Sequence, residues 1–167
     1  MISEKEQKVY DVLKKLNISY TRYEHIPVFT IEEASELDIN TKGHHCKNLF
    51  IRNRKGNVHY LVVIEESKKV DLKELSSQLK STPLSFASED RLHKFLGLTP
   101  GSVTPFGLIN DVNKEVIVAI DDMYSSHAEN TTICFHPNVN TATIEISLRD
   151  FKRYLEWCRN KILYVQI

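Results

Sequence analysis

Residues 43–50 read GHHCKNLF and hold the densest group of side chains capable of chemistry in this chain. Imidazole and thiolate groups are the ligands that zinc prefers, and zinc ligands are usually spaced by two to four residues with a second cluster elsewhere. Neighbouring residues on a strand point to opposite faces, so His44, His45 and Cys46 cannot converge on one ion. We therefore expect no metal here, and interpret both histidines as turn residues that precede a strand.

Two further readings of this cysteine depend on a distant segment. Cys134 and His136 are two residues apart and could share a face, so together with Cys46 and one of the adjacent histidines they form a conceivable metal site. Cys46 and His136 could also form a nucleophilic thiol–imidazole pair. No local spacing supports either reading, and a free cysteine is more often a small buried hydrophobe.

Lys47 is the more informative neighbour. On a strand that begins near Cys46 it shares a face with Leu49 and Ile51, whereas Cys46, Asn48 and Phe50 take the other face. A lysine on an apolar face must find a partner, extend its ammonium to solvent or line a cleft. Extension to solvent is the plain alternative to a functional role.

Two other stretches are dense in groups that could bind a ligand. Residues 97–111, GLTPGSVTPFGLIND, contain three glycines and two prolines, which predicts an ordered loop rather than a helix or strand. Within it, residues 101–105 (GSVTP) offer backbone N–H groups to a carbonyl or phosphate oxygen. Residues 136–141, HPNVNT, form a polar turn in which a histidine can carry a proton or donate a hydrogen bond. Either stretch alone could be purely structural.

The elements that must position these residues follow from caps and periodicity. Ser3 with Glu6 opens a helix over residues 3–16, and similar caps open helices at 30–37, 71–79, 88–96 and from 147. Strands are predicted at about 19–25, 46–53, 57–65, 116–120, 133–135 and 141–146, with an edge strand at 161–167. Strands and helices do not alternate strictly, so we predict an α+β fold with a mixed sheet.

The composition excludes several classes of protein. The chain has 167 residues, so we expect a single domain over residues 1–167. It has 22 basic and 22 acidic side chains, so it lacks the overall positive electrostatic field of a general nucleic-acid binder. The longest apolar run, 60–64, is too short to span a membrane, and the first residues have no signal-peptide core. Three cysteines without a CxxC fit a reducing compartment, and we expect a cytoplasmic protein.

Taken in order, these motifs resemble the YbaK/prolyl-tRNA-synthetase-type editing domains. The resemblance is carried by KNLF at 47–50, PGSVTPFGLIND at 100–111 and FHPNxNT at 135–141, with EHIPVFTIEEA at 24–34 upstream. It spans about residues 20–157 and is nearest to the free-standing prolyl-tRNA editing proteins, which act on alanyl-tRNA(Pro). The resemblance implies a mostly antiparallel curved sheet with surrounding helices, and a hydrolase that needs no metal or other cofactor.

The resemblance also assigns roles. The key lysine of the family falls on Lys47, its GxxxP loop on Gly101 and Pro105, and its pocket histidine on His136. An aminoacyl ester is already activated, so placement and oxyanion stabilisation matter more than a strong nucleophile. We expect the 101–105 loop to hold the oxyanion and Lys47 to hold the ribose hydroxyls or adjacent phosphate, and we assign no general base. Further substrate contacts are expected from Ile26, Val28, Thr30, Asn48, Ser102, Val103, Thr104, Pro105, Phe106 and Asn138; of these, Ile26, Val28 and Phe106 are candidate walls of a pocket too small for proline.

The expected partners are the acceptor end of tRNA(Pro) and prolyl-tRNA synthetase, and no membrane. Two basic stretches could contact phosphates, or could be merely solvated charges: Arg149, Lys152, Arg153, Arg159 and Lys161 near the last helix, and Arg52, Arg54 and Lys55 at a hairpin tip. Cysteinyl-tRNA(Pro) or another small misacylated tRNA is the alternative substrate. A tRNA-binding module without catalysis is the alternative from a different class, and a metal-dependent enzyme is the weakest one.

Overall fold

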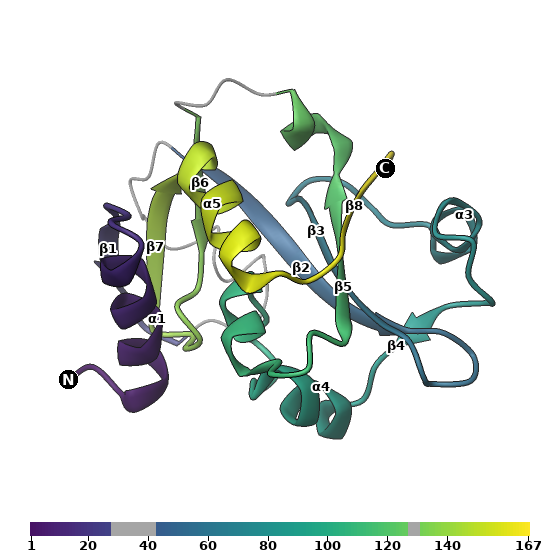
Figure 1. Cartoon of the computed structure of the whole chain (residues 1–167), viewed down its shortest axis with the longest axis horizontal. Helices are drawn as coiled ribbons and strands as arrows, with labels where there is room; N and C mark the ends of the chain where they lie inside the picture. The colour runs from purple at the N-terminus through teal and green to yellow at the C-terminus, as the bar shows by residue number, and fades with distance from the viewer. Residues whose placement is uncertain (28–42, 127–130) are drawn as a thin grey trace.

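The computed structural model describes residues 1–27, 43–126 and 131–167. Eight strands, four α-helices and two short 3-10 helices make up these parts of the chain (Figure 1). In chain order they are α1 (Glu4–Lys15), β1 (Thr21–Glu24), β2 (His44–Arg52), β3 (His59–Glu65), α3 (Leu72–Gln78), β4 (Ser85–Phe86), α4 (Glu89–Leu96), η1 (Pro105–Asn110), β5 (Val116–Asp121), η2 (Asp122–Ser125), β6 (Thr132–Phe135), β7 (Ala142–Ser147), α5 (Leu148–Cys158) and β8 (Ile162–Val165).

The described α-helices begin where the sequence places a capping side chain. The side chains of Ser3, Asp71, Ser88 and Ser147 each accept from a backbone N–H of the first turn, which satisfies a donor that has no partner inside the helix. Helix α4 ends at Gly97, whose φ of 66° is easy for a glycine. These four helices are therefore confirmed.

The strands form one sheet in the order β1-β7-β6-β2-β3-β5-β8, with β4 paired to the end of β2. Four of the pairings between described strands are antiparallel and three are parallel. Strand β2 runs diagonally across the molecule and is shared by both halves of the sheet (Figure 1). The predicted mixed, mostly antiparallel sheet of an α+β fold is confirmed.

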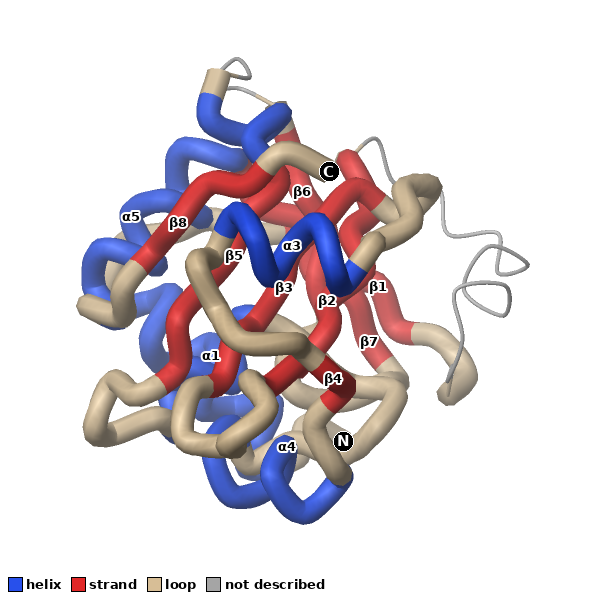
Figure 2. The backbone as a smooth tube through the Cα atoms, turned by 90° about the vertical axis from the view of Figure 1, so that its right-hand side faces the viewer, coloured by secondary structure: helices blue, strands red, loops and turns tan. Residues whose placement is uncertain are grey.

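Helices cover both faces of the sheet. Helix α3 lies over β3 and β5 on one face, while α1 and α5 lie on the other (Figure 2). The run over residues 60–64 is buried on both sides because Leu61 and Val63 join the core under α1, α4 and α5, whereas Tyr60, Val62 and Ile64 join the core under α3. We call these the first core and the second core.

Some expectations from the sequence need correction, and one concerns residues outside the described ranges. His44 and His45 are strand residues and not turn residues, because they pair in parallel with Ile133 and Cys134 of β6. The 97–111 segment is not loop throughout, since Thr104 and Pro105 start the short helix η1. The two-residue strand β4 was not predicted, and the predicted helix over 30–37 lies outside the described residues. No helix in the described ranges is long and apolar enough to cross a membrane.

Candidate functional site

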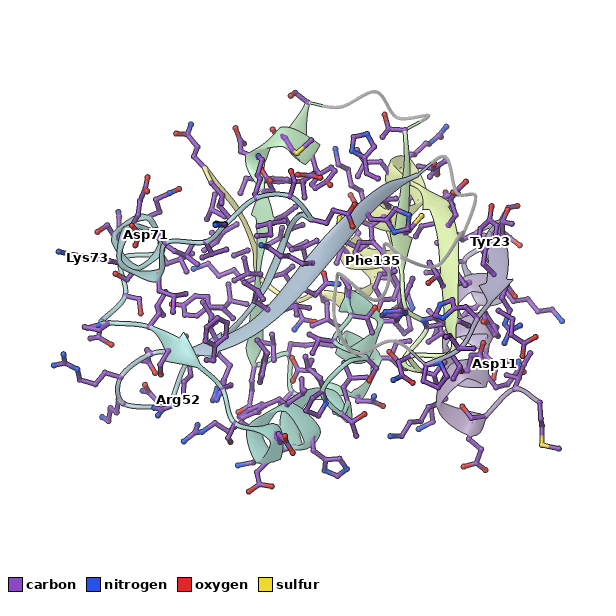
Figure 3. All side chains as sticks on the ribbon, turned by 180° about the vertical axis from the view of Figure 1, so that it is seen from behind. Asp11, Tyr23, Arg52, Asp71, Lys73 and Phe135 are labelled. Atoms are coloured by element: carbon purple, nitrogen blue, oxygen red, sulfur yellow. The ribbon has the colours of Figure 1, made fainter. Side chains whose placement is uncertain are left out.

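The candidate site lies where two parallel strands separate. Among the described residues, β2 and β6 pair at His44–Ile133 and His45–Cys134, and from Cys46 onward β2 is paired with β3. Lys47 and Asn48 therefore follow the separation on one strand, while residues 136–138 follow it on the other. Phe135, the last residue of β6, lies centrally between Tyr23 of β1 and the α3 region marked by Asp71 and Lys73 (Figure 3).

Lys47 shares a face of β2 with His45 by strand alternation, and His136 directly follows the last residue of β6. His45 and Cys134 are register partners, and Lys47 and His136 each follow one of them by two positions. Lys47 is opposite Ile64 of β3, a residue of the second core, and its face carries Leu49 and Ile51 as predicted. Its side chain is half-buried, and its ammonium has no hydrogen-bond or ion-pair partner among the residues that the structure describes. It is thus a cation available to a ligand.

The loop predicted to bind oxygen is held between these two strands. Asn48 of β2 donates its side-chain N–H to the carbonyl of Val103 at 3.2 Å, and Asn138 donates to the carbonyl of Phe106 at 3.5 Å. The amide oxygens of both asparagines are buried and have no hydrogen-bond partner within the described chain. The structure therefore brings Asn48, Asn138 and the loop together.

Three backbone N–H groups of this loop are unpaired. Those of Gly101, Val103 and Thr104 have no hydrogen-bond partner in the described ranges, whereas the N–H of Ser102 bonds to the Thr99 carbonyl at 3.2 Å. Thr104 is fully buried (0 % exposed), and a buried N–H without a partner is rare in folded proteins. Gly101 has a φ of 89°, a conformation that side chains with a Cβ rarely adopt. The loop is therefore a fixed set of donors suited to an oxyanion.

His136 has a defined protonation pattern. Its Nδ1 lies 2.8 Å from the carbonyl of Ala142, which can only accept, so Nδ1 carries the proton and Nε2 of the neutral ring is an acceptor. Burial lowers the pKa of His136, and the nearby His25 and His45 lower it further, against the opposing hydrogen bond to Ala142. At neutral pH, His136 is thus a neutral acceptor of hydrogen bonds.

His25 belongs to the same cluster, although its residue type and spacing alone did not indicate a site. Its ring lies 5.9 Å from that of His136, and its Nε2 is 2.9 Å from the Thr143 hydroxyl. Its Nδ1 is 2.8 Å from the carbonyl of Ile26, so it is held on both sides. The sequence signal was its place in the motif EHIPVFT at the end of β1.

The alternative roles for Cys46 do not fit the geometry. Its thiol lies 3.3 Å from the Tyr124 hydroxyl, on the face of β2 opposite His45 and Lys47. Burial raises the pKa of the Cys46 thiol to about 12, so it is not a thiolate at neutral pH. Across the described residues, no three His, Cys, Asp or Glu side chains are arranged to hold a metal ion.

Other predicted contact residues have structural partners. The Ser102 hydroxyl donates to the Thr99 carbonyl at 2.9 Å, and the Thr104 hydroxyl caps η1 by accepting from the Phe106 N–H. Pro105 is buried, and Phe106 is a core residue whose ring contacts Phe135 and Tyr154. Ile26 is 68 % exposed, while Val28 and Thr30 lie outside the described residues.

The basic stretches have partners or positions that do not connect them to Lys47. Helix α5 packs on the first core, so its cations lie on the other side of the sheet from Lys47. One of them, Arg153, is already bound to Asp150 at 2.8 Å and to the Leu16 carbonyl at 2.6 Å. The stretch near the last helix is therefore not assigned to the site, and at the hairpin tip Arg52 already donates to the carbonyls of Asn53 and Arg54.

The fold and the site together indicate one class of protein. The fold is a curved mixed sheet, and a lysine, a histidine and a donor loop lie where two of its strands separate. The family model described as "Aminoacyl-tRNA editing domain" matches residues 25–154. The chain belongs to this family, and its activity class is that of an aminoacyl-tRNA deacylase.

Individual relatives fit the same family. The chain is 45% identical over 151 residues to the prolyl-tRNA editing protein ProX of Acetoanaerobium sticklandii, and this alignment covers 90% of each chain. It is 36% identical over 150 residues to the prolyl-tRNA synthetase associated domain-containing protein 1 of Danio rerio, covering 90% of this chain and 80% of the relative. A solved structure of a candidate trans-editing enzyme for prolyl tRNA synthetase has the same fold, with a TM-score of 0.71 and 15% identity over 100% of this chain and 99% of that one.

Proposed function

We propose that this chain is a single-domain hydrolase that acts in trans on mischarged tRNA(Pro), with alanyl-tRNA(Pro) as its substrate and alanine and tRNA(Pro) as its products. The observation that carries the proposal is the set of N–H groups at Gly101, Val103 and Thr104, which have no partner among the described residues and lie next to Asn48 and beside the strand of Lys47. The names of the relatives, which refer to prolyl-tRNA editing and prolyl-tRNA synthetase, support the choice of tRNA.

The proposed reaction is hydrolysis of the ester between the amino acid and the terminal ribose. Water adds to the ester carbonyl, the resulting oxyanion is stabilised by the loop N–H groups, and the bond from the carbonyl carbon to the ribose oxygen breaks. The ribose oxygen takes a proton and leaves as the tRNA hydroxyl. We assign no general base, and a ribose hydroxyl of the substrate can take part in the proton transfer.

The side chains would place the ester against the loop. Lys47 holds the ribose hydroxyls or the adjacent phosphate with its ammonium, which has no partner within the described ranges. The neutral His136 accepts a hydrogen bond through Nε2 from the attacking water or from a ribose hydroxyl. The reaction requires no cofactor, because the ester is already activated and placement contributes most of the rate.

Selectivity would come from exclusion. A site that admits alanine rejects proline by steric clash, which discriminates better than weaker attraction does. Ile26 and Val28 remain the proposed walls, whereas Phe106 is a core residue that supports the loop from below and is no longer proposed as a wall. We propose that the acceptor end of tRNA(Pro) binds here in the cytoplasm, with prolyl-tRNA synthetase as a further partner.

The test is a panel of deacylation reactions with the purified protein. Alanyl-tRNA(Pro), cysteinyl-tRNA(Pro) and prolyl-tRNA(Pro) are each incubated with the protein, and the fraction still charged is followed in time. We expect alanyl-tRNA(Pro) to be hydrolysed fastest and prolyl-tRNA(Pro) to be spared. Preference for cysteinyl-tRNA(Pro) would change the substrate, binding of tRNA without turnover would favour a binding module, and negligible rates on all three would refute the proposal.

A further inference from the structure

Four consecutive carbonyl groups at the end of the donor loop, those of residues 103–106, accept hydrogen bonds from protein donors. Thr99 O accepts from Ser102, and Thr104 O accepts from the N–H of Gly107 at 3.1 Å. The next acceptors are reached by side chains from three separate elements: Asn48 on Val103, Tyr154 on Pro105 at 2.8 Å and Asn138 on Phe106. This ring of donors fixes the orientation of the peptide planes between residues 103 and 106.

Tyr154 provides the shortest of these three side-chain bonds and approaches from α5, on the core side of the loop. It is fully buried (0 % exposed), and its ring packs 5.0 Å from the Phe106 ring and 6.3 Å from the Trp157 ring. Burial raises the pKa of Tyr154 well above its ordinary value, so the hydroxyl stays protonated and remains a donor.

This arrangement has a geometric consequence for catalysis. The carbonyl and the N–H of a peptide unit point in opposite directions, so a carbonyl that is fixed on the protein side leaves the N–H groups of the same segment on a defined side. Donors that are fixed before the reaction starts need no reorganisation when charge develops on the substrate. The plane held by Asn48 through the Val103 carbonyl carries the Thr104 N–H, so its rotation would displace that donor. The plane held by Tyr154 through the Pro105 carbonyl carries the Phe106 N–H, which is bonded to the Thr104 hydroxyl, so its rotation would shift Thr104 through the chain.

We propose that Tyr154 and Asn48 are positioning residues that hold the oxyanion loop by its carbonyl groups, and that neither bonds to the substrate through those donor atoms. The proposal rests on the proposed function, since it concerns the same loop. It adds Tyr154, a residue of the core helix α5, to the groups that determine the rate, and it gives Asn48 a role in holding the loop.

Tyr154→Phe tests the role of the hydroxyl, because it keeps the ring and removes only the bond to Pro105. Tyr10→Phe is the matched control: Tyr10 is also buried, and its hydroxyl donates to Glu6 at 2.6 Å on α1. We expect kcat for alanyl-tRNA(Pro) to fall by about tenfold to a hundredfold in Tyr154→Phe, because misplaced donors lose transition-state stabilisation. KM and the affinity for an amide-linked alanyl-tRNA(Pro) analogue should change less than about twofold, and Tyr10→Phe should keep the wild-type kcat.

The thermal midpoint is measured for every variant, and kcat is measured well below it. Equal kcat values for wild type and Tyr154→Phe would overturn the proposal, as would a loss that lies entirely in the affinity for the analogue. If Tyr154→Phe does not fold, Asn48→Ala applies the same test to the Val103 carbonyl, with the same expected and opposing results. An active wild-type protein whose variants are unimpaired refutes the positioning role alone, whereas an inactive wild type overturns the proposed function together with it.

Discussion

His59 is expected to make the stability of the fold depend on pH in a defined window. The residue begins β3 and is 2 % exposed, with its ring 4.1 Å from the Phe95 ring. Its Nε2 lies 3.0 Å from Nη1 of Arg91, which always donates, so the histidine must be neutral there. Burial lowers the pKa of His59 to about 4, and the positive charges of Arg91, Arg52 and Lys94 contribute to the change.

The magnitude follows from the difference between the two states. In the unfolded chain the pKa of His59 is 6.5, so below that pH the unfolded state binds a proton that the folded state does not. The contribution to stability is therefore complete above pH 6.5 and is lost as the pH falls toward 4. At about 1.4 kcal/mol per pH unit, the free energy of unfolding falls by about 2 kcal/mol at pH 5 and by about 3 kcal/mol below pH 4.

Urea unfolding at several pH values between 7.5 and 4.5 measures this loss. Carboxylates also titrate in this range, so the His59 contribution is the difference between wild type and His59→Gln, whose amide oxygen can still accept from Arg91. We expect the curve of His59→Gln to be flatter by about the amounts above, and the exposed His93→Gln to follow the wild type. Parallel curves for wild type and His59→Gln would refute the reasoning.

Three further predictions concern the site. Gly101→Ala should lower kcat by at least about tenfold and the unfolding free energy by about 1–2 kcal/mol, because a Cβ is strained at a φ of 89°; kinetics and urea unfolding measure the two effects. Cys46→Ala should retain deacylation within about twofold, and inactivation of this variant would restore the thiol as a candidate nucleophile. For His136, whose pKa is lowered by burial, the single-turnover rate should fall only as the pH drops below 6.5, and His136→Ala should lack this acid limb; an acid limb centred above pH 7 would contradict the neutral form.

The local parts of the fold were predictable because their signals are local. Ser3, Asp71, Ser88 and Ser147 each begin a helix, and all but Ser88 are followed by an acidic residue three positions on. The apolar run over residues 60–64 is a strand buried on both faces, as its composition indicates. Such elements are determined by neighbours in the chain.

The features that the sequence did not predict also have physical causes. The dense glycines and prolines of residues 97–111 concealed η1, although Thr104 before Pro105 is a capping residue followed by a proline in the first helical position. The strand character of His44 and His45 depends on pairing with β6, some 90 residues away in the sequence, which no local pattern contains.

The candidate site likewise has residues that local motifs predict and residues whose role depends on packing between distant segments. Lys47, the loop and His136 could be selected from motifs, and the placement of Lys47 with Leu49 and Ile51 on one face of β2 is confirmed. Tyr154 could not be selected, because in sequence it is one apolar position of an amphipathic helix. Its hydroxyl acquires a partner only when α5 packs against the loop.

The most direct test of the central claim is the single-turnover deacylation of alanyl-tRNA(Pro) by wild type, Lys47→Met and Lys69→Met. Lys47 is the half-buried cation at the strand separation, whereas Lys69 is exposed and serves as the control for loss of one positive charge. We predict that Lys47→Met loses at least about a hundredfold in rate with an unchanged unfolding midpoint, while Lys69→Met stays within about twofold. A Lys47→Met protein that deacylates at the wild-type rate would contradict the account.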